Sequence, residues 1–157
     1  MSPATPLLRS FAAHLIALDA KLKNASRSSP ATQFSVIEKL RPPLTNLMGG
    51  AGFSALISRS LALAAAEIPA LRTVQVNADG VWEGLEALAA QLGTDSFLEA
   101  RVVVLAQLLG LLVAFVGEAL TLRLVAEIWP NLPPTITSDL SSNRQDFRKR
   151  DRHEKNN

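Results

Sequence analysis

The chain of 157 residues has no cysteine and no tyrosine, and it has two histidines. Without cysteine it cannot form a disulfide framework, a thiolate metal site or a cysteine nucleophile. The two histidines, His14 and His153, leave little material for a zinc site or for acid–base catalysis. Aromatic residues make up 5% of the sequence, which disfavours a ligand pocket lined by rings. We therefore expect close helix packing rather than a metal or cofactor site.

Charged residues are also scarce, and they are unevenly distributed. They make up 19% of the chain, against 48% apolar residues. Residues 134–157 hold ten charged residues and three apolar ones, so this segment cannot bury a core. The sequence therefore predicts a single helical domain over residues 1–133 and a disordered polar tail over residues 134–157.

Apolar residues recur at helical spacing over most of the body. The clearest run is Leu7, Phe11, Leu15, Leu18 and Leu22, which forms one face of an amphipathic helix. The same periodicity, ended by prolines and glycines, predicts helices over residues 6–23, 33–41, 44–68, 83–92 and 96–129. We therefore expect an all-α fold, a multi-helix bundle with a long apolar helix near its C-terminal end.

Breaks in this pattern predict hinges and one hairpin. The predicted hinge residues are Pro42, Pro43, Gly49, Gly50 and Gly52. Proline has no N–H for the helix, and glycine tolerates non-helical backbone. The alternation in residues 73–76, followed by Asp79-Gly80, predicts a short β-hairpin near residues 73–82 that must lie against the helices.

The long helix carries a stripe of small side chains on one face. Its members are Ala106, Gly110, Ala114, Gly117 and Thr121. Small side chains let another backbone approach closely, either the segment 53–68 through Ala55, Ala62 and Ala66, or a second copy of the chain. Because the rest of the helix is apolar almost all round, we expect a homodimer or a complex with another helical protein.

Three charged residues, Glu118, Arg123 and Glu127, lie on this apolar helix. A buried charge must be paired or neutralised, so we expect them to pair with one another, line an interface or mark the helix ends. An alternative is an enzyme that uses Glu118 or Glu127 together with Arg123 in a helical pocket. No complete nucleophile elbow, phosphate loop or zinc motif accompanies them, so we expect no catalysis and no cofactor.

A membrane role is the second alternative. The run Val102–Gly117 is broken only by Gln107, but it is shorter than the roughly 20 residues of a spanning helix, and charges flank it. We therefore expect this segment to be a core helix of a cytoplasmic protein. The alternative is a membrane-associated protein with residues 102–120 inserted in the bilayer. No secretory signal is expected, since prolines and Arg9 break the N-terminal apolar runs.

The basic residues of the tail are candidates for a contact with phosphates or acidic lipids. They are Arg148, Lys149, Arg150 and Arg152. Interleaved acidic residues reduce the local positive potential, which argues against nucleic acid as a partner.

One short motif suggests a signalling relative. It consists of Leu40, Arg41, Pro43, Leu44, Thr45 and Gly49. These positions resemble the phosphoacceptor box of sensor histidine kinases, except that Glu38 replaces the phosphoaccepting histidine and Lys39 the following glutamate. The resemblance covers residues 38–49 and implies a helical-hairpin dimer that binds a response-regulator-like partner without passing phosphate. From the residues themselves we expect a non-enzymatic interaction module, an adaptor or regulatory subunit that forms a homodimer.

Overall fold

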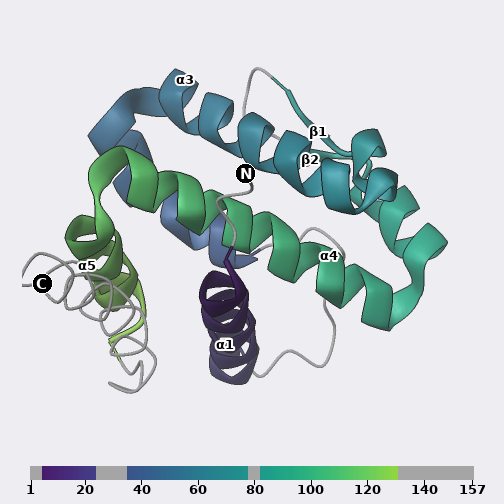
Figure 1. Ribbon diagram of the computed structural model, residues 1–157, viewed down its shortest axis with the longest axis horizontal. Helices are drawn as coiled ribbons and strands as arrows, with labels where there is room; N and C mark the ends of the chain where they lie inside the picture. The colour runs from purple at the N-terminus through teal and green to yellow at the C-terminus, as the bar shows by residue number, and fades with distance from the viewer. Residues whose placement is uncertain (1–4, 24–34, 78–81, 131–157) are drawn as a thin grey trace, which may run out of the picture.

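The computed structural model describes residues 5–23, 35–77 and 82–130 (Figure 1). The predicted all-α fold is confirmed. Its elements, in chain order, are α1 (Pro6–Lys23), α3 (Ser35–Glu67), the 3₁₀ turn η1 (Pro69–Thr73), β1 (Gln75–Val76), β2 (Trp82–Glu83), α4 (Leu85–Val116) and α5 (Glu118–Ile128). The predicted tail and its basic residues lie outside the described residues.

The long helix α4 is the centre of the bundle. Helix α3 lies beside it, while α1 and α5 both project from one side of it (Figure 1). Every residue from Val103 to Gly110 is buried, including the polar Gln107. A helix buried on all sides needs neighbours on all sides, and α1, α3, α5 and η1 supply them within the described chain.

Glycines break the long helices where prolines do not. Helix α3 continues through Pro42 and Pro43, so the predicted end of a helix there is wrong. The break lies at Gly49, with φ 81° and ψ 164°, while Gly50 and Gly52 remain helical. Leu40 and Leu44, on either side of the prolines, have no exposed surface. Burying both leucines contributes about 3–6 kcal/mol, which is of the same order as the cost of about 3 kcal/mol for each of the two internal prolines.

The predicted helix over residues 96–129 is in fact divided between two elements. Gly117, with φ 94°, ends α4 and begins α5. At its other end α4 runs back to Leu85 and includes residues 85–92 of the predicted helix 83–92, with a kink at Gly93. Glu83 belongs to β2 instead. Both breaks fall at glycine because glycine alone adopts a positive φ without a steric penalty.

The predicted hairpin is confirmed. Gln75 pairs with Glu83 and Val76 with Trp82 in an antiparallel arrangement, while the predicted turn at Asp79-Gly80 lies outside the described residues. Gly84 follows with φ 91°, and a Cβ there would lie 2.5 Å from the carbonyl oxygen of Thr73. Only glycine fits at this junction between the hairpin and α4.

Two glycine substitutions separate this steric requirement from backbone strain. Gly93 also has a positive φ, but a Cβ there would meet nothing within 4 Å. Gly93→Ala should therefore lower the free energy of unfolding by about 1–2 kcal/mol, the cost of left-handed backbone alone. Gly84→Ala should lower it by clearly more, as measured by urea denaturation. Equal losses in the two variants would show that the contact with Thr73 is unimportant.

Candidate functional site

The small-residue stripe lies mostly inside the chain. Ala106, Gly110 and Thr121 are buried, Gly117 is half-buried and Ala114 is exposed. Gly110, Ala114 and Thr121 line a cavity whose opposite wall is α1. The stripe therefore faces α1 rather than the predicted segment 53–68, and most of it is not open to a second copy.

Helix α3 buries its larger apolar side chains and leaves its alanines outside. Phe53, Ile57 and Leu61 are buried. The predicted contact residues Ala55, Ala62 and Ala66 are exposed, so the expectation that they pack on the long helix is wrong. Both faces of α3 are apolar, and the face with the larger side chains removes more apolar area from water when it packs inward.

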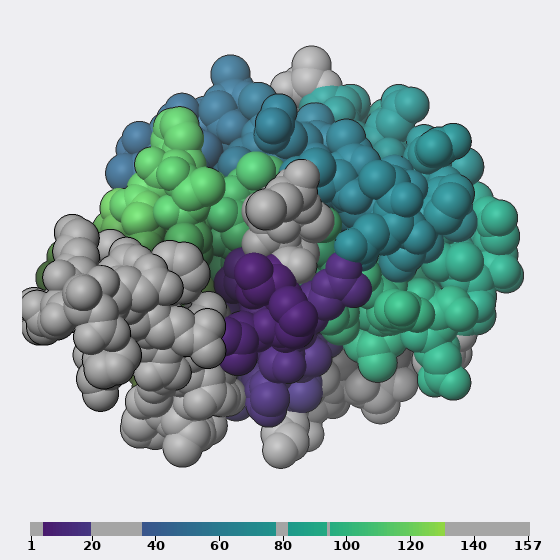
Figure 2. All heavy atoms as spheres, viewed as in Figure 1, coloured from purple at the N-terminus to yellow at the C-terminus, as the bar shows by residue number. Residues whose placement is uncertain are grey.

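The outward side of α3 forms a continuous small-residue surface, which we call the alanine face. It consists of Ala51, Ala55, Ser58, Ala62 and Ala66, all of them exposed and spaced three or four residues apart. Helix α3 lies along the top of the molecule in Figure 2. Ser58 and Ala62 of the alanine face line a hollow whose other wall is formed by η1 and β1. The alanine face is thus available to a partner.

Within the part of the chain that the structure describes, two helices are long and apolar enough to cross a membrane by length and composition. They are Val36–Glu67 in α3 and Asp95–Val116 in α4. In the most apolar stretch of the first, 28% of the residues are buried, against 56% in the second. Buried core helices have the same composition, so the low burial of α3 is the more informative observation.

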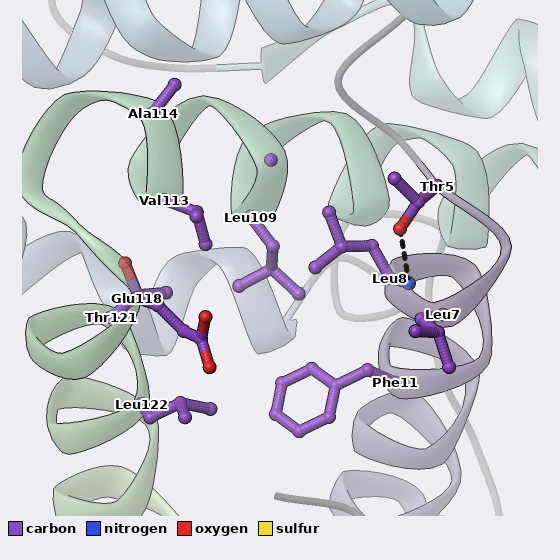
Figure 3. Close-up of a pocket in the computed structure, with 11 residues that line it drawn as sticks. Thr5, Leu7, Leu8, Phe11, Leu109, Val113, Ala114, Glu118, Thr121 and Leu122 are labelled. Carbon is purple, nitrogen blue, oxygen red and sulfur yellow. Dashed lines mark hydrogen bonds between the residues drawn. The ribbon is translucent and has the colours of Figure 1, made fainter. Parts of the chain in front are cut away.

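A cavity of about 320 Å³ lies between α1, α4 and α5 (Figure 3). Leu8 and Phe11 come from α1, Leu109 and Val113 from α4, and Leu122 from α5. Gly117 positions the third wall, because the chain turns there and α5 descends opposite α1 (Figure 1). The volume is within the range of small-molecule sites, about 300–1,000 Å³.

Three polar side chains reach this cavity, and two of them are bonded to helix backbone. The Thr5 hydroxyl accepts a hydrogen bond from the N–H of Leu8 at 3.2 Å, which caps α1. The Thr121 hydroxyl donates to the carbonyl of Gly117 at 2.8 Å. The third is Glu118, the first residue of α5, whose carboxylate points into the space between Leu109, Phe11 and Leu122 (Figure 3).

The three charged residues predicted to be buried are not brought together. Glu118 is half-buried, but Arg123 and Glu127 are exposed, so the expectation of burial is wrong for these two. No ion pair joins any of the three within the described part of the chain. Arg123 and Glu127 follow Glu118 by five and nine residues, which places them on other sides of α5. The cavity therefore offers one carboxylate, without the arginine that the enzyme alternative requires.

A buried polar junction joins α1, α3 and the end of α5. Asp19 is 3% exposed and forms an ion pair with Lys39. The indole N–H of Trp129 donates to Asp19 Oδ1 at 3.4 Å, and Lys39 Nζ lies 5.9 Å from the centroid of the Trp129 ring. Burial lowers the pKa of nearby Arg101, while the charge of Asp19 opposes that shift. This junction fixes the angle at which α1 meets the bundle.

The motif that resembles the phosphoacceptor box makes a second polar junction. The Glu38 carboxylate accepts hydrogen bonds from Arg41 Nε and Nη2, both at 2.8 Å, and from Trp82 Nε1 at 2.7 Å. The hydrogen bonds from Arg41 hold the pKa of Glu38 below its ordinary value, partly opposed by burial. Glu38 thus attaches the hairpin to α3, and the position that matches the phosphoaccepting histidine has a structural contact.

Three residues of the polar junctions, Asp19, Trp82 and Trp129, are absent from the sites predicted from the sequence. A signal for Asp19 exists, because it follows Leu15 by four residues and so falls on the buried face of α1. A charged residue on such a face implies a buried partner. No comparable signal pairs Trp82 with Glu38, since 44 residues separate them.

The lowered pKa of Glu38 predicts a pH-dependent loss of stability. A carboxyl whose pKa is lower in the folded state stabilises the fold above its unfolded value, near 4.5, and that contribution is lost as the pH falls through the folded value. Glu38→Gln should therefore be less stable than the wild type at neutral pH, with the difference closing in acid. Denaturant unfolding at several pH values measures both.

The matched control is Glu99→Gln, which changes an exposed glutamate of α4. It should leave the pH dependence of the wild type intact. A stability difference between the wild type and Glu38→Gln that persists undiminished well below pH 4.5 would contradict the role given to the ionised carboxylate.

Comparisons with protein-family models, with curated proteins and with solved structures find no match to this chain. The features that bear on function are therefore those of its own geometry. They are the cavity between α1, α4 and α5, the alanine face of α3, and the two polar junctions that hold these surfaces in place.

Proposed function

We propose that the chain is a non-enzymatic helical interaction module that pairs with a second copy of itself through the alanine face of α3. The observation that supports this most strongly is the low burial of α3. Its apolar stretch has the composition of a membrane-spanning or core helix, yet 28% of it is buried. A continuous strip of exposed apolar side chains is a candidate interaction site.

A second copy is the occupant that fits the shape of the alanine face. No side chain in this face is larger than that of alanine or serine, although exposed Arg59 borders it. A partner that presents the same face can approach to the short end of helix packing distances, about 8 Å. A twofold axis would match the face to itself, as in most homodimers.

The proposed interface differs from the one expected from the sequence. The stripe on α4 is largely covered by α1, and the centre of α4 is buried within the described chain. The need for a partner to cover α4 is therefore weaker than its composition suggests. Apolar surface remains uncovered on α3, which includes Leu47 and the alanine face, and also on α4, where Leu98 and Phe115 are exposed.

Charged substitutions in the alanine face test the proposal. We expect the full chain to behave as a dimer in size-exclusion chromatography with light scattering, without detergent. The double variant Ala55→Glu, Ala62→Glu places like charges in both copies of the interface and should be monomeric. Both positions are exposed in the single chain, so the circular dichroism spectrum of the double variant should match that of the wild type.

The control is Ala126→Glu, the same change at an exposed position of α5. It should remain dimeric. A wild type that is monomeric at all concentrations, or a double variant that still dimerises, would overturn the proposal.

Membrane association is the second candidate, because two helices meet the length and composition of a membrane span. On this alternative the alanine face would contact lipid instead of a second copy. The chain would then float with lipid vesicles and require detergent for extraction. Membrane association would be excluded if the chain is recovered from a detergent-free extract as a discrete dimer that does not bind added vesicles.

A further inference from the structure

We propose that the cavity between α1, α4 and α5 binds a small amphipathic amine, with the ammonium group against the carboxylate of Glu118 and the hydrocarbon part against α1 and α4. This site is separate from the alanine face of α3 and does not depend on the proposed dimer.

The walls of the cavity define the apolar part of the ligand. Leu8, Phe11, Leu109 and Val113 surround the space with aliphatic carbon and one ring (Figure 3). Its volume of about 320 Å³ equals that of roughly ten water molecules at about 30 Å³ each. An alkyl chain or a single ring fills such a space and releases water from apolar walls, which is favourable.

Glu118 defines the charge of the ligand. Its carboxylate has no hydrogen bond or ion pair within residues 5–23, 35–77 and 82–130. The two threonines that share the cavity are already bonded to backbone. A carboxylate among apolar side chains gains most from a cation that also donates hydrogen bonds, and an ammonium group does both.

The position of Glu118 in the helix does not by itself explain its direction. A glutamate in the first turn of a helix interacts favourably with the helix dipole, and that interaction is equally available when the side chain points to solvent. Here the carboxylate points into the cavity (Figure 3). Its direction is what links the charge to the apolar space.

The same geometry predicts weaker binding of two other ligand classes. An anionic amphiphile such as a fatty acid would place a second carboxylate beside Glu118, and like charges at short range repel. A neutral alcohol can donate a hydrogen bond to the carboxylate, but it carries no positive charge, and a hydrogen bond with one charged partner is weaker than one between two opposite charges. The preference for cation over neutral molecule over anion is therefore the signature of the site.

Three probes of equal chain length read this preference directly. Octylamine, 1-octanol and octanoate are titrated into the full chain at neutral pH, and binding is followed by calorimetry. We expect octylamine to bind saturably and at least about tenfold more tightly than 1-octanol, since hydrogen bonds to charged groups are the stronger kind. Octanoate should bind most weakly.

Glu118→Gln should reduce octylamine affinity about tenfold or more and bring it close to that of 1-octanol. Glu127→Gln makes the same change on an exposed side of α5 and should bind octylamine like the wild type. Ala114→Phe places a ring at an exposed position that lines the cavity and should reduce binding of all three probes. Circular dichroism confirms the fold of each variant.

Three results would overturn the proposal. The first is no saturable octylamine binding up to roughly 1 mM. The second is octanoate or 1-octanol binding as tightly as octylamine. The third is a Glu118→Gln variant that binds octylamine like the wild type. None of these outcomes depends on the oligomeric state, so they also distinguish failure at this site from failure of the α3 interface.

Discussion

The all-round burial of the middle of α4, residues 103–110, is the constraint on which the rest of the structure depends. A helix with apolar side chains on every side must be covered on every side, and the eight residues from Val103 to Gly110 are buried without exception. Helices α3, α1 and α5 provide that cover, and each has to be held at its own angle. The junction of Asp19, Lys39 and Trp129 fixes α1 and the end of α5, and that of Glu38, Arg41 and Trp82 fixes the hairpin on α3.

Both candidate sites are consequences of this way of covering α4. Helix α3 turns its larger side chains inward, which leaves the alanine face outside. Helices α1 and α5 pack against α4 at separate places and project from the same side of it (Figure 1). The space between them is the cavity into which the Glu118 carboxylate points (Figure 3). One glycine, Gly117, controls this second feature, because the positive φ at that residue allows α5 to leave the direction of α4.

The sequence predicts which segments are helical better than it predicts which faces meet. Helix α1 and the hairpin follow from apolar periodicity and alternation, which are local signals. The prolines at 42 and 43 wrongly predict the end of a helix, because the burial of Leu40 and Leu44 offsets the local cost of proline. The prediction that the alanines of α3 pack on the long helix fails for another reason. Periodicity shows which residues share a face, but it does not show which of two apolar faces turns inward. Glu118 belongs to the predicted set, and its separation from Arg123 and Glu127 follows from their spacing of five and nine residues, which is itself a local signal. The break at Gly117 decides instead that Glu118 faces α1 across the cavity.

Amide hydrogen exchange tests most directly the central claim that the chain covers α4 by itself. The full chain is measured in detergent-free buffer, at a dilution where dimers dissociate and again at high concentration. We expect the amides of residues 103–110 to be among the slowest to exchange and to be strongly protected already in the dilute protein, because α1, α3 and α5 of the same chain bury them. Rapid exchange of these amides in dilute protein, with protection restored only by high concentration, detergent or vesicles, would contradict the claim and show that α4 is covered by a partner or by lipid.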